Sequence, residues 1–95
     1  MKFVYLWFVK MTEGAFKKYL ADTKYSQNWM SKVKEILNKH KLKIVAWGSP
    51  YNTVEQIVIG VETDLSLDEF GKIATELYHV DPDFVDYAKT LIISQ

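Results

Sequence analysis

The sequence predicts an α+β domain in which a four-stranded antiparallel sheet carries its helices on one face. Three observations predict it. A chain of 95 residues fits a single domain spanning 1–95. Residues 3–9 read FVYLWFV, an apolar run of strand length that is rich in β-branched and aromatic residues. Further along, patterns with strand and helix periods follow in the order β-α-β-β-α-β.

The first predicted strand covers residues 2–10, and it is apolar on both faces. Side chains alternate between the two faces of a strand. One face carries Val4, Leu6 and Phe8, and the other carries Phe3, Tyr5, Trp7 and Val9. Because neither face can remain in water, we expect this strand to be central. We expect the helices to cover Val4, Leu6 and Phe8, together with Ile57, Ile59, Val61, Leu91 and Ile93.

A helical region follows from residue 12 to about residue 39. The polar stretch 22–26 predicts a bend or break, with Ser26 as a candidate cap for a second segment, although one continuous helix also fits the pattern. Strands at 43–47 and 55–63 are joined by a turn-rich loop at 48–52, which predicts an antiparallel hairpin. Gly60, inside the second of these strands, indicates a bulge or a close approach.

Ser66 and Glu69 form a capping box that begins the second helical region. This helix should end near residues 78–80, because Pro82 disfavours helix at the preceding residue. The last strand covers about 86–94. Right-handed crossovers place both helical regions on the same side of the sheet, which is the ferredoxin-like arrangement with strand order 4-1-3-2.

Two helical regions cannot cover both faces of such a sheet. The residues expected to face away from them are Phe3, Tyr5, Trp7, Val45, Trp47, Val58 and Ile92. A patch of this size exceeds what a monomer usually exposes. The sequence therefore predicts a two-fold homodimer that pairs the open sheet faces.

Charge is divided along the chain. All 12 basic residues are lysine; residues 1–50 carry a net charge of +7 and residues 51–95 carry −7. These are either solvated surfaces or complementary surfaces that steer self-association. The absence of cysteine excludes disulfides and thiolate chemistry. No signal-peptide pattern or membrane span is present in the sequence, so we expect a cytoplasmic protein without a membrane partner.

Two groups of residues are candidates for a site. Four aromatic residues could line a pocket for a planar or apolar ligand, or could belong to the dimer core: Tyr5, Trp7, Trp47 and Tyr51. A polar cluster that could bind zinc or transfer a proton comprises His79, Asp81, Asp83 and Asp86. Its spacing matches no metal motif and Asp-Pro-Asp is typical of a turn, so we expect neither a metal nor a cofactor.

Several function classes lack their motifs. The sequence contains no Gly-x-Ser-x-Gly elbow and no glycine-rich phosphate loop. RNA-recognition domains share this element order but need basic and aromatic residues on the strand at 55–63. That strand reads EQIVIGVET, so we expect no nucleic-acid partner.

Three segments carry a family resemblance: MKFVYLW at 1–7, AWG at 46–48 and ETDLSLDEF at 62–70. With the element order, they resemble the dimeric α/β-barrel superfamily, and most of all its small uncharacterised members. Better-known members include cofactor-free monooxygenases, muconolactone isomerases, haem-dependent chlorite dismutases and amino-acid-sensing domains, whose catalytic motifs have no match here. The resemblance implies a homodimer.

Three functions stay open from the sequence. The first is binding of a small apolar or aromatic molecule between sheet and partner. The second is a cofactor-independent monooxygenase or isomerase acting on an aromatic or polyketide-like substrate. The third is a purely structural or interaction dimer.

Overall fold

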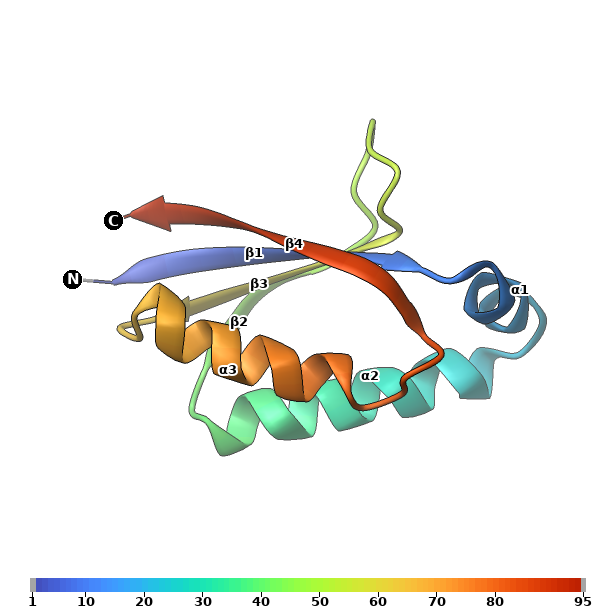
Figure 1. Cartoon of the computed structure of the whole chain (residues 1–95), viewed down its shortest axis with the longest axis horizontal. Coiled ribbons are helices and arrows are strands. Elements are labelled where there is room, and N and C mark those ends of the chain that lie inside the picture. The colour runs from blue at the N-terminus through green and yellow to red at the C-terminus, as the bar shows by residue number, and fades with distance from the viewer. Residues whose placement is uncertain (1, 95) are drawn as a thin grey trace.

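The computed structural model describes residues 2–94 and has the predicted ferredoxin-like α+β fold. Its elements are β1 (Phe3–Met11), α1 (Glu13–Ala21), α2 (Thr23–Lys39), β2 (Lys43–Gly48), β3 (Ile57–Thr63), α3 (Leu67–Tyr78) and β4 (Val85–Ser94). The sheet order is β2-β3-β1-β4 and every neighbouring pair is antiparallel, which confirms the predicted order 4-1-3-2. Both α2 and α3 lie on one side of the sheet, and α1 lies beyond its end (Figure 1).

The helical region at 12–39 is two helices, and the break occurs at Asp22. The backbone of Asp22 is extended, its N–H donates to the carbonyl of Lys18, and its side chain accepts from the N–H of Lys24 at 2.9 Å. The predicted break at 22–26 is therefore confirmed, but the cap is Asp22. Ser26 was the wrong choice, because its hydroxyl donates to the carbonyl of Thr23 within the first turn of α2.

The assignment of the faces of β1 was wrong. Tyr5, Trp7 and Val9 pair with Val61, Ile59 and Ile57. Residues directly opposite each other in a sheet share a face, and Tyr5 stacks on Phe70 of α3 with ring centroids 4.5 Å apart. The larger side chains of β1 thus fill the space between sheet and helices. The residues that face away from the helices are Val4, Leu6 and Phe8.

The same correction applies to the edge strands. In β4, Leu91 and Ile93 pair with Leu6 and Val4, so they face away from the helices, and Ile92 pairs with Tyr5 on the helix side. In β2, Trp47 pairs with Ile59 and also belongs to the helix side. The prediction for Ile57, Ile59 and Val61 is confirmed, since all three are buried in the helix-side core.

Gly60 combines both features that the sequence indicated. A Cβ at this position would lie 3.1 Å from Cδ2 of Leu6 and 3.2 Å from Cβ of Ala46. The facing strand β2 shifts register between Ile44 and Ala46. Gly60 therefore permits the close approach of β1 and β2 side chains on the face away from the helices.

That face, which we call the open face, is mainly apolar, although Lys43, Glu62 and Lys89 share it. It carries Val4, Leu6, Phe8, Val45, Ala46, Val58, Leu91 and Ile93. Leu91 and Ile93 are 51% and 48% exposed, and within residues 2–94 no helix packs over them (Figure 1). In the described chain, moreover, no helix has the length and apolar character needed to cross a bilayer.

Candidate functional site

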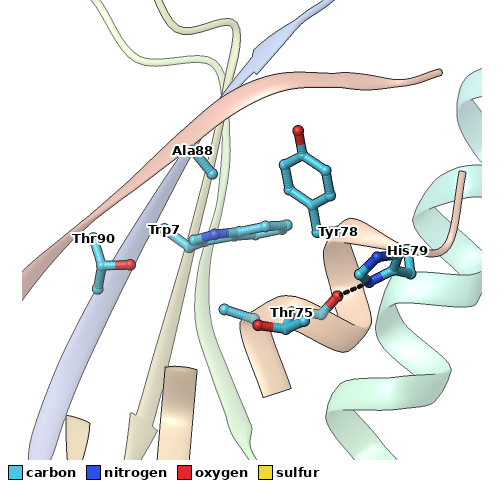
Figure 2. Close-up of a pocket in the computed structure, with 7 residues that line it drawn as sticks. Trp7, Thr75, Tyr78, His79, Ala88 and Thr90 are labelled. Carbon is cyan, nitrogen blue, oxygen red and sulfur yellow. Dashed lines mark hydrogen bonds between the residues drawn. The ribbon is translucent and has the colours of Figure 1, made fainter. Parts of the chain in front are cut away.

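A cleft of about 370 Å³ lies between α3 and the β1–β4 pair, on the helix side of the sheet. Figure 2 shows the side chains that line it: Trp7, Ala74, Thr75, Tyr78, His79, Ala88 and Thr90. Thr90 and Ala88 sit beside Trp7 and Val9 in the ladder, so both face α3. The cleft exists because Ala74, Ala88 and Thr90 are too small to fill the space around the indole.

Trp7 forms the apolar floor of the cleft. It is only 3% exposed, and its indole reaches from β1 toward α3 (Figure 2). A buried indole fixed on a central strand presents a rigid, flat surface at little entropic cost, and ligand pockets commonly use aromatic walls of this kind. The shape and chemistry of this floor suit a planar, apolar group.

His79 supplies the polar end of the cleft. It caps the C-terminus of α3, and its Nδ1 lies 2.8 Å from the carbonyl oxygen of Thr75 (Figure 2). A carbonyl can only accept, so Nδ1 must carry the hydrogen. In the neutral ring, Nε2 is then an unprotonated acceptor, which can receive a hydrogen bond or a proton from a ligand.

Two hydroxyl groups add to this polar end. The hydroxyl of Tyr78 donates to the carbonyl of Asp86 over a long 3.5 Å, and the tyrosine ring stands edge-on to His79 with centroids 6.0 Å apart. Thr90 lines the cleft from β4. The Thr75 hydroxyl is already used, because it donates to the carbonyl of Gly71 at 3.0 Å. The cleft thus joins an apolar floor to one strong acceptor and two adaptable hydroxyls.

The structure does not bring the four candidate aromatic residues together. Only Trp7 lines the cleft. The buried Tyr5 hydroxyl donates to the carbonyl of Leu65 at 2.6 Å, and burial raises the pKa of Tyr5. Trp47 lies under the ammonium of Lys34, 5.2 Å from the ring centroid. Tyr51 is 94% exposed in the β2–β3 loop.

The predicted polar cluster is also divided. His79 lines the cleft, whereas Asp81 and Asp83 form the turn before β4. Asp81 accepts from the backbone N–H of Asp83 at 3.0 Å and from the hydroxyl of Tyr25 at 3.2 Å. The Asp81 carboxylate therefore holds the turn against α2. Within residues 2–94 no group of three or more His, Asp or Glu residues could hold a metal ion.

Five lining residues were not identified from the sequence: Ala74, Thr75, Tyr78, Ala88 and Thr90. A signal for some of them was present. Ala88 and Thr90 alternate along β4 as a run of small or polar side chains on one face. Such a run on a face covered by a helix indicates unfilled space, but it becomes informative only once that face is known to meet α3.

No protein-family model matches the sequence, and no curated protein matches it. Solved structures do match. A NIPSNAP family protein of unknown function from Agrobacterium tumefaciens superposes with a TM-score of 0.59 at 20% identity, over 99% of this chain and 87% of that one. A second crystal structure of the same Agrobacterium protein gives a TM-score of 0.53 at 17% identity, over 99% and 92%.

An uncharacterized NIPSNAP domain protein from Burkholderia xenovorans gives a TM-score of 0.52 at 9% identity, over 98% of this chain and 93% of that one. Likeness at these identities is likeness of fold. The chain is similar in its whole extent to ferredoxin-like proteins of unknown function.

Proposed function

We propose that this chain is a homodimeric member of the dimeric α/β-barrel superfamily that binds a small planar, largely apolar molecule in the cleft beside Trp7. The observation that carries the proposal is the cleft itself. A buried indole, two alanines and a histidine whose Nδ1 is held by the carbonyl of Thr75 line one space of about 370 Å³. This volume is near the lower end for small-molecule sites, which suits a ligand of one or two fused rings.

The cleft's chemistry specifies how such a ligand would bind. Its ring would lie on Trp7, between the alanines of α3 and β4. A hydroxyl or N–H at its other end would donate to Nε2 of His79. The proposed place is therefore on the helix side of the sheet, whereas the sequence led us to expect ligand binding between the open face and the partner.

The open face supports the dimer. Eight apolar residues share it, and Leu91 and Ile93 at its edge are about half exposed. The largest apolar patch on a soluble protein is often an interaction site. A second copy packed face to face would cover it, and the cleft on the opposite side of each sheet would remain accessible.

The test uses two probes with the same fused-ring system, 2-naphthol and 2-methoxynaphthalene, which differ by one methyl group on the oxygen and of which only the first can donate a hydrogen bond. Calorimetric titration should show 2-naphthol binding about 10-fold more tightly, the value of one good hydrogen bond. His79→Gln should abolish most of the difference in affinity between the two probes. The matched control is His40→Gln, outside the cleft, which should preserve that difference. Failure of both probes to bind, or to raise the melting temperature, would contradict the proposal.

A second candidate function is proton transfer within the bound molecule, as in a cofactor-independent isomerase. The observation that favours it is the place of His79 beside an apolar floor, with Nδ1 held by the carbonyl of Thr75 so that Nε2 is the acceptor of the neutral ring. That nitrogen would remove a proton from a carbon next to a carbonyl and return it to another carbon, so no co-reactant is required. Deuterium exchange into 2-tetralone, followed by NMR, should be faster with the wild type than with His79→Gln.

A further inference from the structure

The segment between β2 and β3, residues 49–56, stands out from the sheet on the side opposite α2 and α3 (Figure 1). We call this segment the arm. It carries Tyr51, which is 94% exposed, and Val54, which is 67% exposed. Tyr51 is the most exposed of the large hydrophobic side chains in the described chain. Single exposed apolar side chains are common on proteins, but two of them on one projecting segment can act as a contact surface.

The base of the arm is fixed to the open face. Glu55 is only 3% exposed, and its carboxylate accepts hydrogen bonds from the hydroxyls of Thr53 and Tyr87. The ammonium of Lys89 lies 3.4 Å from the same carboxylate and 5.6 Å from the ring centroid of Phe8. These contacts hold the pKa of Glu55 down to about 2, with the hydroxyl hydrogen bonds as the largest cause. The arm is therefore anchored, which lowers the entropic cost of any contact made by its tip.

The open face alone is small for a stable dimer. Four strands at about 4.8 Å spacing and seven residues at about 3.3 Å give a flat area of roughly 450 Å². Stable interfaces bury about 800 Å² on each partner. A dimer that pairs these faces needs further contact surface, and the arm stands on the correct side of the sheet to supply it.

The two ends of the open face differ in how well their apolar residues are covered. At the arm end, Lys89 covers Phe8, and Tyr87 is tied to Glu55. At the far end, Leu91 and Ile93 are about half exposed. The arm leaves the β2–β3 edge of the sheet, and Leu91 and Ile93 lie on β4 at the opposite edge. A two-fold axis that runs between the two sheets, parallel to them and oblique to the strands, places the arm corner of one copy over the Leu91–Ile93 corner of the other, twice.

We propose that the arm reaches across the homodimer and packs Tyr51 and Val54 against Leu91 and Ile93 of the partner subunit. The inference rests on the homodimer proposed above and adds its geometry: the strands of the two paired sheets cross at a steep angle, and each arm covers the far end of β4 in the other subunit. The occupant of the exposed tip is thus a second copy of this chain.

Disulfide cross-linking tests this geometry, because the natural chain contains no cysteine. The test variant is Tyr51→Cys with Ile93→Cys. The matched control is Tyr51→Cys with Ile92→Cys, since Ile92 is 45% exposed but lies on the opposite face of β4. A disulfide between positions 51 and 93 of the same chain is not expected, because the two positions belong to opposite ends of the sheet. Ile93 pairs with Val4, whereas the arm leaves the sheet next to Val9. Five residues of strand separate these points by about 17 Å, and a disulfide needs Cα atoms within about 7 Å.

We expect mild oxidation to give a covalent dimer on a non-reducing gel for the Ile93 pair and little for the Ile92 pair. A second measurement uses Tyr51→Ser with Val54→Ser, whose exposed positions leave the fold intact. This variant should raise the dimer dissociation constant about 30-fold, as loss of two interface anchors does. Leu20→Ser, at a position 69% exposed on α1, should leave it unchanged.

The outcomes separate this inference from the dimer itself. A wild-type dimer with no cross-link for the Ile93 pair and an unchanged dissociation constant for the serine variant would overturn the arm contact and leave the dimer standing. A wild-type monomer at micromolar concentration would overturn both. Equal cross-linking of the two pairs would also overturn the inference, because it would mean that the arm has no fixed position on the partner.

Discussion

Replacing Trp7 by alanine tests whether the indole packs in the core between the sheet and α3 and also forms the floor of the cleft. Trp7 is 3% exposed, and a buried tryptophan removes about 200 Å² from water. At about 25 cal/mol per Å² this is worth about 5 kcal/mol. Residual burial in the unfolded chain lowers that value to about 3–4.5 kcal/mol.

The position of Trp7 narrows the expected loss further. One side of the ring borders the cleft, so the space left by Trp7→Ala would be open to water and would not be a sealed void. We therefore expect a loss of about 3–4 kcal/mol in the free energy of unfolding, within the range for large-to-small core changes. Trp7→Phe keeps an aromatic floor and should lose less than half of this amount.

The assay is urea unfolding followed by far-ultraviolet circular dichroism, with all variants at one protein concentration, because a dimer gains stability with concentration. Leu20→Ala, at an exposed site on α1, is the control and should change the free energy by less than about 0.5 kcal/mol. A loss below about 1 kcal/mol for Trp7→Ala would refute the placement of the indole between sheet and α3.

Three further predictions concern single residues. Gly60→Ala should destabilise the fold by about 1–2 kcal/mol in the same assay, because the new methyl group meets Leu6 and Ala46 at 3.1 and 3.2 Å; an unchanged or raised stability would show that these side chains move aside freely. Ser66→Ala removes the capping box of α3 and should lower the free energy of unfolding by about 1 kcal/mol. A loss of only a few tenths of a kcal/mol would mean that the cap is redundant. Glu55 has a folded-state pKa of about 2 against an ordinary 4.5, so its stabilising contribution is complete above pH 4.5 and is lost as the pH falls toward 2. Urea midpoints between pH 5 and 2 should fall more steeply for the wild type than for Glu55→Gln, and parallel curves would disprove this role of the carboxylate.

The element order could be predicted from the sequence because local patterns determine it. The capping box at Ser66 and Glu69 and the polar break before α2 act within one turn of chain, and the structure contains both. The strand order followed from the handedness of the crossovers. None of these features depends on a contact between distant residues other than strand pairing.

The faces of β1 could not be predicted in the same way. Residues 3–9 are apolar on both faces, so alternation defines two sets of side chains without saying which set meets the helices. The register between β1 and β3 decides it, and that register joins residues far apart in the sequence, such as Trp7 and Ile59. The error then passed to Leu91, Ile93 and Trp47, whose faces had been assigned relative to β1.

The candidate site was only partly predictable for the same reason. Trp7 and His79 were singled out by their residue types, but the cleft that joins them depends on where α3 crosses β4. The ion pair of Glu55 with Lys89 gave no local signal, because the two residues are 34 positions apart. Burial of this single carboxylate is visible only in the folded chain.

The most direct test of the account is the molecular mass in dilute solution, since the open apolar face requires a second copy to cover it. Sedimentation equilibrium at low micromolar concentration should give about twice the chain mass of 11.1 kDa. The mass should be the same at low and high salt, because salt screens charge contacts but not apolar ones. Leu91→Lys, which places a charge on the open face, should give 11.1 kDa. A wild-type mass of 11.1 kDa under both salt conditions would contradict the account.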